Sequence, residues 1–187
     1  MSAMATAYIG LGANLGDRAG TLREAVRRLG DLGQVTRVSS LYETAPVGFV
    51  EQPAFLNAVV ELQTDLDAAE LIAAVLGIEA SQGRTRSFRN APRTLDLDLL
   101  LLDDVVVSSE GVQVPHPRLH ERLFVLTPLA EIVPDLIHPV FHQSVKQLKG
   151  ALVAQDDVER VAGPGWVSPR AGGAETGRGH SGNRASG

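Results

Sequence analysis

The sequence predicts an α+β fold with a largely antiparallel sheet and helices packed on it, over one face. Three observations favour this class. Apolar residues alternate in several short segments, two longer segments carry helical spacing behind capping residues, and the two kinds of segment follow a fixed order. That order is strand, helix, strand, strand, helix, strand, which is the split β-α-β arrangement. With 187 residues and 44% apolar content, the chain is long enough for one core and too short for two.

The first half of this arrangement is expected within residues 7–43. Residues 7–12 predict a strand that ends in a glycine-rich turn. A helix follows, because Thr21 and Glu24 have the spacing of a capping box and Gly30 supplies a C-terminal stop. Residues 34–43 are rich in β-branched side chains and predict a single second strand.

The second half begins with a strand over residues 55–62, in which apolar residues alternate with the others. This alternation places Phe55 and Asn57 on the same face of the strand. Asp67 and Glu70 then have capping-box spacing and open a second helix, which Gly83 is expected to close. Its predicted buried stripe consists of Leu71, Val75 and Ile78.

The last strand of the arrangement carries two carboxylates within an apolar run. Asp96 and Asp98 share one face of a strand, whereas Leu95, Leu97 and Leu99 point to the other. The two aspartates lie roughly 6.6 Å apart by strand rise, which suits a pair of divalent cations about 4 Å apart. The alternative is an edge strand whose solvent face is acidic.

Beyond this strand, the sequence predicts an additional C-terminal hairpin and a helical segment on a ferredoxin-like core. The hairpin is expected around residues 114–117, and short helical pieces are expected over residues 123–132, where Pro128 limits any long helix. Residues 1–162 are therefore expected to form one domain. Eight of the 19 glycines lie in residues 163–187, which predicts a disordered Gly/Ser-rich tail. We expect Trp166 to be solvated there, and local docking onto the domain is the alternative.

Composition limits the classes of partner. The net charge of −5 argues against general affinity for nucleic acid or an anionic membrane, so we expect a small-molecule partner and a monomer. The absence of cysteine excludes disulfides and thiolate metal sites. No apolar run approaches the ~20 residues of a membrane span, and residues 1–5 do not resemble a signal peptide. These features predict a cytoplasmic protein.

A cluster of arginines precedes the two aspartates. Guanidinium groups are forked donors that suit phosphate oxygens, and paired carboxylates with Mg²⁺ commonly accompany a polyphosphate. The segment therefore predicts a site for a metal–nucleotide complex. In the alternative, the arginines neutralise the aspartates and Glu79 in a surface salt-bridge network, or form a flexible loop unrelated to function. The four arginines are Arg84, Arg86, Arg89 and Arg93.

These motifs together resemble the 6-hydroxymethyl-7,8-dihydropterin pyrophosphokinase family of folate biosynthesis. The resemblance covers residues 6–139 in consistent order and spacing. It rests on Gly83-Arg84 followed by residues 92–98 (PRTLDLD), and on residues 8–17 (YIGLGANLGD), 39–44 (SSLYET), 55–57 (FLN), 114–117 (VPHP) and 122–129 (RLFVLTPL).

The resemblance implies transfer of a pyrophosphoryl group from ATP to the hydroxymethyl oxygen of the reduced pterin, with release of AMP. It implies that Asp96 and Asp98 hold two Mg²⁺ ions, and that Arg84 and Arg93 stabilise charge on the triphosphate as catalytic residues. His116, Arg122 and Glu79 would make further contacts with ATP. For Glu79, an ordinary helix-surface charge is the alternative.

The pterin site is also implied by the resemblance. The family places the pterin ring between two aromatic side chains, and Phe55 and Phe124 stand at the matching positions. Asn57 would bind the pterin edge, together with backbone groups of the loop from Thr44 to Val47. Without the resemblance, the two phenylalanines would be interpreted as ordinary core residues.

The chain also departs from the family pattern at three positions. Some members carry Trp at the position of Asn90, Tyr at that of Pro117 and Arg at that of Gly111. We therefore expect the stacking on the adenine side and the phosphate contacts to differ from those members, and we assign no role to Asn90 or Pro117.

Three other readings compete with the pyrophosphokinase. A dinucleotide-binding enzyme is disfavoured because the third glycine of residues 10–16 comes one residue late for G-x-G-x-x-G. A two-metal hydrolase would need more ligands than this strand offers. A non-catalytic ferredoxin-like ligand-binding module remains the main alternative.

Overall fold

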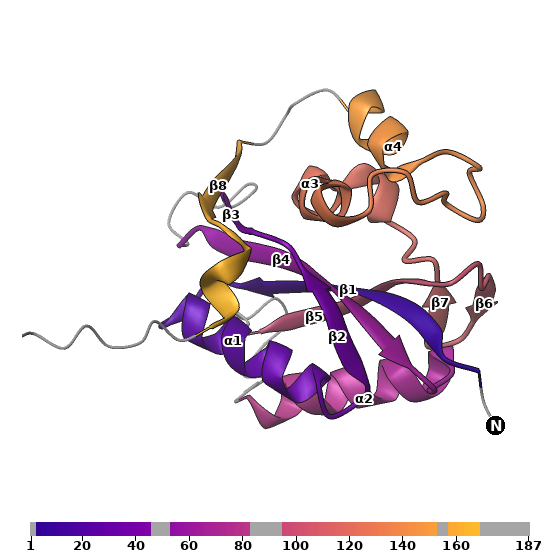
Figure 1. The fold of residues 1–187 in the computed structure, drawn as a ribbon, viewed down its shortest axis with the longest axis horizontal. Coiled ribbons are helices and arrows are strands. Elements are labelled where there is room, and N and C mark those ends of the chain that lie inside the picture. The colour runs from indigo at the N-terminus through magenta and orange to yellow at the C-terminus, as the bar shows by residue number, and fades with distance from the viewer. Residues whose placement is uncertain (1–2, 46–52, 83–94, 153–156, 169–187) are drawn as a thin grey trace, which may run out of the picture.

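A six-stranded antiparallel sheet forms the centre of the molecule (Figure 1). The computed structural model describes residues 3–45, 53–82, 95–152 and 157–168. Its elements, in chain order, are β1 (Ala5–Ala13), α1 (Arg18–Leu29), β2 (Gln34–Val38), β3 (Leu41–Thr44), β4 (Phe55–Thr64), α2 (Ala68–Ser81), β5 (Asp96–Leu102), β6 (Val107–Ser109), β7 (Val112–Val114), the 3₁₀ turn η1 (Leu119–Glu121), α3 (Leu123–Ile132), α4 (Val145–Ala151), β8 (Val158–Ala162) and the 3₁₀ turn η2 (Pro164–Val167).

The strand order of the sheet is β5-β1-β4-β3-β8, and β2 also pairs with β4. Every pairing among these strands is antiparallel. The two α-helices that follow β1 and β4 lie on the same face of the sheet, as the split β-α-β arrangement requires (Figure 1). The predicted α+β, ferredoxin-like class is therefore confirmed.

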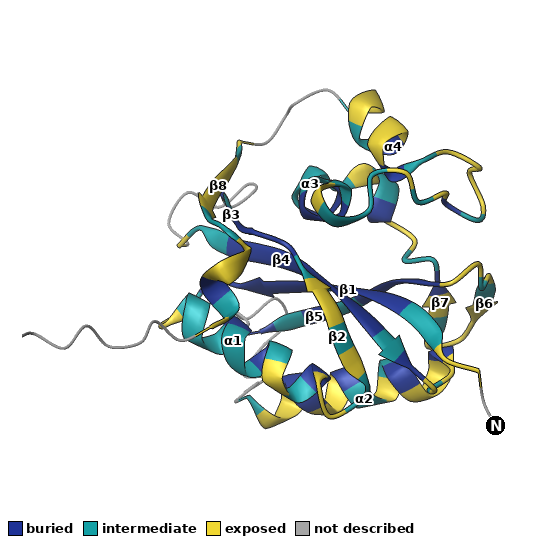
Figure 2. Ribbon diagram, in the orientation of Figure 1, coloured by how far each residue is buried: buried dark blue, intermediate teal, exposed yellow. Residues whose placement is uncertain are grey.

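The main core lies between the sheet and the two helices α1 and α2. Alternate residues of the central strand β1, including Ile9 and Leu11, point into it and are buried. Leu71, Val75 and Ile78 of α2 meet them, as the helical spacing predicts. Figure 2 shows the central strands mostly in the colour of buried residues, while β2 faces solvent along much of its length.

The N-termini of the two long helices bear out the sequence analysis to different degrees. For α2, Asp67 and Glu70 form the predicted capping box, in which each side chain accepts the other residue's backbone N–H. For α1, the expectation that Thr21 is the cap is wrong. The helix begins one turn earlier, because the Asp17 side chain accepts the Gly20 N–H and caps it first.

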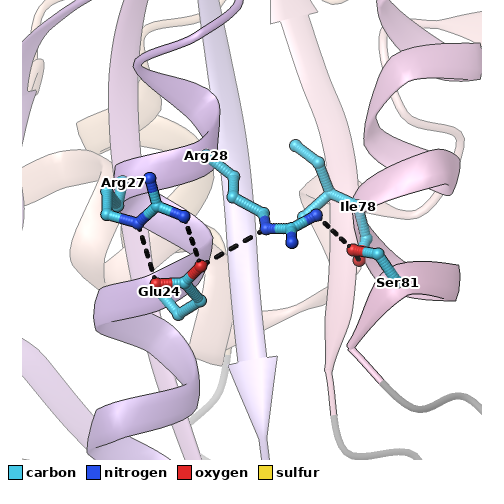
Figure 3. Close-up of polar contacts among 5 residues, drawn as sticks. All are labelled: Glu24, Arg27, Arg28, Ile78 and Ser81. Atoms are coloured by element: carbon cyan, nitrogen blue, oxygen red, sulfur yellow. Dashed lines mark hydrogen bonds and ion pairs between the residues drawn. The ribbon is translucent and has the colours of Figure 1, made fainter.

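Polar contacts on the outer side of the helix layer join α1 to α2 (Figure 3). Glu24 accepts hydrogen bonds from Arg27 and Arg28, which lie three and four residues later on the same helix. Arg28 also donates to the Ser81 hydroxyl at the C-terminal end of α2. This contact joins the two helices close to the point where α2 ends. Gly83, the expected helix stop, lies outside the described residues.

The opposite face of the sheet is also covered, which corrects the expectation that helices cover only one face. Helices α3 and α4 pack there on Tyr8, Val59, Leu100 and Leu101 and form a second, smaller core (Figure 1). Helix α3 spans the whole predicted segment with Pro128 inside it, so that proline does not limit the helix as expected. Within the described ranges, no helix combines the length and apolar character needed to cross a membrane.

Two other local predictions differ from the structure. The segment from residue 34 to residue 43 forms two strands rather than one, because the backbone breaks at Ser39 and Ser40 between β2 and β3. The additional hairpin consists of β6 and β7, so its turn lies at Glu110 and Gly111 rather than around residues 114–117. Gly111 has a φ of 77°, a conformation that favours glycine.

The C-terminal segment is ordered at least as far as residue 168. Strand β8 pairs with β3 at the edge of the sheet, and η2 packs beside α1. Trp166 is 7% exposed, and its indole N–H donates to the Ser39 carbonyl at 2.8 Å. The expectation of a solvated Trp166 in a tail that begins at residue 163 is therefore wrong. Residues 169–187 of that tail lie outside the described residues.

Candidate functional site

A cleft of about 510 Å³ opens on the sheet face that α1 and α2 leave uncovered. Its walls come from β1, β3, β4 and β5 on the sheet side and from η1 and the start of α3 on the other. This volume is in the range of small-molecule sites. Seven of the twelve site residues predicted from the sequence line it: Thr44, Phe55, Asn57, Asp96, Asp98, Arg122 and Phe124.

The remaining five predicted residues divide into two groups. Glu79 and His116 are not lining residues: Glu79 is hydrogen-bonded to Leu97, between the two aspartates, and His116 lies beside Asp98. Val47, Arg84 and Arg93 lie outside the described residues, and so does Asn90.

The two aspartates project from β5 into the cleft. The register places Asp96 opposite Gly12 and Asp98 opposite Gly10 of β1, so no neighbouring side chain on that strand covers either carboxylate. Both aspartates are half-buried, while Leu97 between them is buried in the main core. The predicted alternation of faces along this strand is confirmed.

Two cationic or potentially cationic groups stand near the Asp98 carboxylate. Arg122 Nη1 lies 3.9 Å from one of its oxygens, and His116 Nε2 lies 3.9 Å from the other. Both distances exceed a hydrogen bond, and the Asp98 side chain is 44% exposed, so its oxygens are open to a ligand. Carboxylate oxygens of this kind are the ligands that Mg²⁺ prefers.

The His116 ring is held in one orientation. Its Nδ1 accepts the Arg118 backbone N–H at 3.1 Å, so the neutral ring carries its hydrogen on Nε2, toward Asp98. Burial lowers the pKa of His116 below its usual value, Arg122 and Arg118 lower it further, and Asp98 opposes them. The neutral ring therefore faces the carboxylate as an N–H donor.

Glu79 is a buried carboxylate and not a helix-surface charge. It is 4% exposed, and its carboxylate accepts the backbone N–H of Leu97 at 2.7 Å. This bond ties the end of α2 to β5 at the residue that separates Asp96 from Asp98. Among the described residues, Glu79 thus supports the strand that carries the two aspartates.

The lining of the cleft also includes two aromatic rings and a pair of polar side chains. Phe55 and Phe124 are half-buried and line the cleft from opposite walls, so they are not simply core residues. Between β3 and β4, the Asn57 amide donates to the Thr44 hydroxyl at 2.9 Å. Both polar side chains are buried, at 6% and 4% exposure. Arg122 lies over the Phe124 ring, 5.7 Å from its centroid.

The lining residues that sequence reasoning missed include Gly10, Gly12, Arg118 and Glu121. The glycines had a usable signal, since they alternate along β1 and fall on the face shared with the aspartates. A side chain at residue 12 would meet the Asn57 amide oxygen at 3.3 Å, so glycine keeps this part of the cleft open. Arg118 and Glu121 had no comparable signal, because they follow an irregular segment.

The chain is similar in sequence to known proteins. The sequence profile of the family described as 7,8-dihydro-6-hydroxymethylpterin-pyrophosphokinase (HPPK) matches residues 8–134. A 2-amino-4-hydroxy-6-hydroxymethyldihydropteridine pyrophosphokinase from Bacillus subtilis is 52% identical over 128 residues, which are 67% of this chain and 77% of that protein. The protein of the same name from Aquifex aeolicus is 38% identical over 146 residues, 78% of this chain and 91% of that protein.

A solved structure resembles the fold as well. The crystal structure of wild-type Plasmodium falciparum HPPK-DHPS has a TM-score of 0.64 at 14% identity, over 79% of this chain and 44% of that longer one. At this identity, the likeness supports the fold alone. The profile match and the two bacterial relatives each cover about two thirds of the chain or more, and the profile match includes every described residue of the cleft. The chain therefore belongs to the 7,8-dihydro-6-hydroxymethylpterin-pyrophosphokinase family.

Proposed function

We propose that this protein transfers a pyrophosphoryl group from ATP to the hydroxymethyl group of 6-hydroxymethyl-7,8-dihydropterin in folate biosynthesis. The observation that carries the proposal is that two chemically different groups of side chains line one cleft. Asp96 and Asp98 form one group, and the aromatic and amide groups of Phe55, Asn57 and Phe124 form the other. Such a cleft can bring a metal-bound polyphosphate and a flat heterocycle together, which a single-ligand module does not need.

The aspartates suit a metal–nucleotide complex. Both are half-buried carboxylates on one face of β5, and the residues paired with them on β1 are Gly12 and Gly10. Two carboxylates leave most Mg²⁺ coordination positions to water and phosphate, as is usual for Mg²⁺ at polyphosphate sites. Mg²⁺ held by these carboxylates would supply positive charge to offset that of the polyphosphate. We propose two ions, held by Asp96 and Asp98.

The other polar groups around Asp98 would act on the phosphates. Arg122 and the Nε2–H of His116 lie within 4 Å of the Asp98 carboxylate and can donate to phosphate oxygens there. Arg84 and Arg93, proposed to stabilise the charge that develops during transfer, lie outside the described residues. Glu79 would contribute to ATP binding by supporting β5 through Leu97.

In the same cleft, the pterin would lie between the rings of Phe55 and Phe124. Offset stacking on these faces is favourable for a flat heterocycle. Asn57 and Thr44 already form a hydrogen-bonded pair, and their remaining donor and acceptor capacity would meet the pterin edge. Backbone groups of the loop from Thr44 to Val47 are proposed to complete the edge contacts.

In the reaction, the hydroxymethyl oxygen attacks the β-phosphorus, and the bond from that phosphorus to the α-phosphate bridging oxygen breaks. The products are AMP and the dihydropterin pyrophosphate, and the hydroxyl proton leaves to solvent. The residues of this chain contribute by holding the two substrates in line and by stabilising charge, which are the main sources of catalysis in phosphoryl transfer.

The identity of the nucleotide product tests the proposal. The protein is incubated with ATP, Mg²⁺ and the pterin, with parallel samples that lack the pterin or contain a chelator. We expect AMP in a one-to-one ratio with pterin pyrophosphate, and neither product in either control. Formation of ADP, or pterin binding without turnover, would favour another kinase chemistry or the non-catalytic module.

The monomeric state and the cytoplasmic location also stay predictions. Light scattering tests the first, and cell fractionation tests the second.

A further inference from the structure

The break between β2 and β3 is held from both faces of the sheet. Ser39 and Ser40 form this break, and both are fully buried. From the side of the main core, the Trp166 indole N–H donates to the Ser39 carbonyl at 2.8 Å. From the other side, the Glu131 carboxylate accepts the Ser40 backbone N–H at 2.9 Å and the Ser40 hydroxyl at 2.8 Å. The two contacts join segments 127 and 91 residues apart in sequence.

On the Trp166 side, the contact belongs to a continuous C-terminal clamp, formed by β8 and η2. Strand β8 pairs with β3 from Leu41 to Thr44. The Trp166 backbone carbonyl accepts a hydrogen bond from Arg23 of α1 at 2.8 Å, so this residue is held through both its backbone and its indole. The clamp therefore holds both the start of β3 and its outer edge.

On the Glu131 side, the contact reaches the walls of the cleft. The same Glu131 oxygen that accepts the Ser40 N–H also accepts the Tyr42 hydroxyl at 2.7 Å. Tyr42 lies directly opposite Asn57 in the sheet. Burial and the bond to Glu131 raise the pKa of Tyr42 to about 12, so the phenol stays a donor.

Glu131 also belongs to the helix that carries the second aromatic wall. Phe124 lies seven residues earlier on α3, two turns away and on the same face of the helix. The carboxylate thus connects the helix bearing Phe124 to the strand pair bearing Thr44 and Asn57. The distance across the cleft between Phe124 and this strand pair depends on how α3 packs against β3.

We propose that Glu131 and Trp166 are positioning residues for the pterin, which fix β3 and α3 relative to one another through Ser39 and Ser40. The inference rests on the proposed function, since it assumes that the pterin binds among the residues that these contacts position. Neither residue lines the cleft. The aspartates lie on β5, and β1 and β4 separate β5 from β3. Removing the contacts of Glu131 or Trp166 should therefore weaken pterin binding and leave the binding of Mg²⁺-ATP unchanged.

The experiment compares variants on the two faces of the break. Glu131→Ala removes three hydrogen bonds, and we expect the KM for the pterin to rise about tenfold. Glu131→Gln keeps the oxygen that accepts from Ser40 and Tyr42, and its amide can donate to the Ser40 hydroxyl, so it should stay within about twofold of wild type. Trp166→Phe keeps an aromatic ring but loses the bond to Ser39, and a rise of about threefold is expected.

The matched control is Glu159→Gln, which removes an exposed carboxylate from β8 and should change neither KM. Pterin and ATP affinities are also measured by equilibrium binding below the melting temperature of each variant. If Glu131→Ala does not fold, Tyr42→Phe and Ser40→Ala each remove one of the bonds and should each raise the pterin KM about threefold.

The outcomes separate the inference from the proposed function. Wild-type protein that neither binds nor converts the pterin would overturn the proposed function and the inference with it. If wild type is active, an unchanged pterin KM in Glu131→Ala would overturn the inference alone. So would an equal rise in both KM values, because it would indicate general loosening of the fold. Failure of Glu131→Gln to retain affinity would show that charge, and not hydrogen-bond geometry, determines the effect and would also contradict the inference.

Discussion

At the scale of single residues, Asp98 is the side chain on which the proposed chemistry depends most. Its carboxylate faces Gly10 across the sheet, is 44% exposed, and has Arg122 and His116 at 3.9 Å. Because these neighbours approach without forming hydrogen bonds, the carboxylate is available to a metal–phosphate complex. Its environment is therefore suited to binding a ligand rather than to holding the fold together.

Asp98→Asn tests this role, because the amide keeps the shape of the side chain and loses its charge. We expect Mg²⁺-dependent turnover to fall by at least about 10²-fold, the usual cost of losing a group that stabilises transferring charge. Steady-state AMP formation measures the effect, and thermal unfolding should show an unchanged melting temperature. Asp104→Asn, at an exposed residue just beyond the same strand, is the control. Full activity of Asp98→Asn would contradict the metal assignment.

The residues of the candidate site were predictable where their signal is local. The aspartates share a face because side chains alternate along a strand, and Phe55 and Asn57 share one for the same reason. The burial of Glu79 was not predictable, because it depends on a backbone N–H 18 residues away. Arg118 and Glu121 enter the cleft from a 3₁₀ turn and the residues before it, where no periodicity assigns a face.

At the scale of elements, capping decides where the helices begin. In α2, the side chains of Asp67 and Glu70 each accept the other residue's backbone N–H. The helix itself provides no partner for either of these N–H groups. Asp67→Ala should lower the free energy of unfolding by about 1 kcal/mol, measured by urea denaturation. Asp65→Ala, two residues earlier and also exposed, should leave it nearly unchanged. Equal losses in the two variants would contradict the assignment of the cap.

The loop between α3 and α4 depends on an uncharged histidine. The Nδ1 of His138 accepts the backbone N–H groups of Val140 and Phe141 at 3.1 and 3.2 Å. Burial lowers the pKa of His138 below its usual 6.5, and His120 and His142 lower it further. The unfolded chain therefore binds the proton more readily, so this stability is present above pH 6.5 and is lost as the pH falls through the folded pKa.

His138→Asn tests the pH dependence, because the asparagine oxygen can accept the same N–H groups but does not titrate. Urea denaturation between pH 7.5 and pH 5 should show a smaller loss of stability in the variant than in wild type, with similar values at pH 7.5. His142→Asn, at an exposed position on the same loop, is the comparison. Identical slopes for wild type and His138→Asn would contradict the role given to His138.

Element prediction succeeded where the evidence lies within a few residues and failed where it comes from distant segments. The capping box of α2 and the buried stripe behind it are local patterns, and both are present in the structure. The break at Ser39 and Ser40 depends on Glu131 and Trp166, which lie far along the chain. The start of α1 was misplaced because Asp17 competes with Thr21 for the cap.

At the scale of the whole molecule, the sheet has two unlike faces. One is covered by α1 and α2 and carries most of the core, and the other is shared between α3, α4 and the cleft. The order of elements was enough to predict that helices cover the first face, because amphipathic helices between strands must pack on the sheet. The second face was not predicted, because α3 and α4 follow irregular segments whose path the local pattern does not determine.

The C-terminal clamp should contribute to global stability. Ending the chain after residue 157 removes β8 and Trp166, and it exposes the edge of β3 and part of the main core. We expect a loss of about 2–3 kcal/mol from the indole alone, measured by urea denaturation. A chain that ends after residue 168 keeps the clamp and serves as the comparison. If both shortened chains were equally stable, the clamp would have no part in stability.

The place of the clamp in the sequence also has a consequence for synthesis. Strand β8 and η2 are made after every other described element, yet they cover the edge of β3, which is laid down more than 100 residues earlier. Until they emerge, a nascent chain presents a strand edge with free backbone groups, which is the kind of surface that pairs with other chains. The growing protein should therefore be most prone to aggregation just before β8 is translated, and premature termination in this stretch should favour inclusion bodies over simple loss of activity.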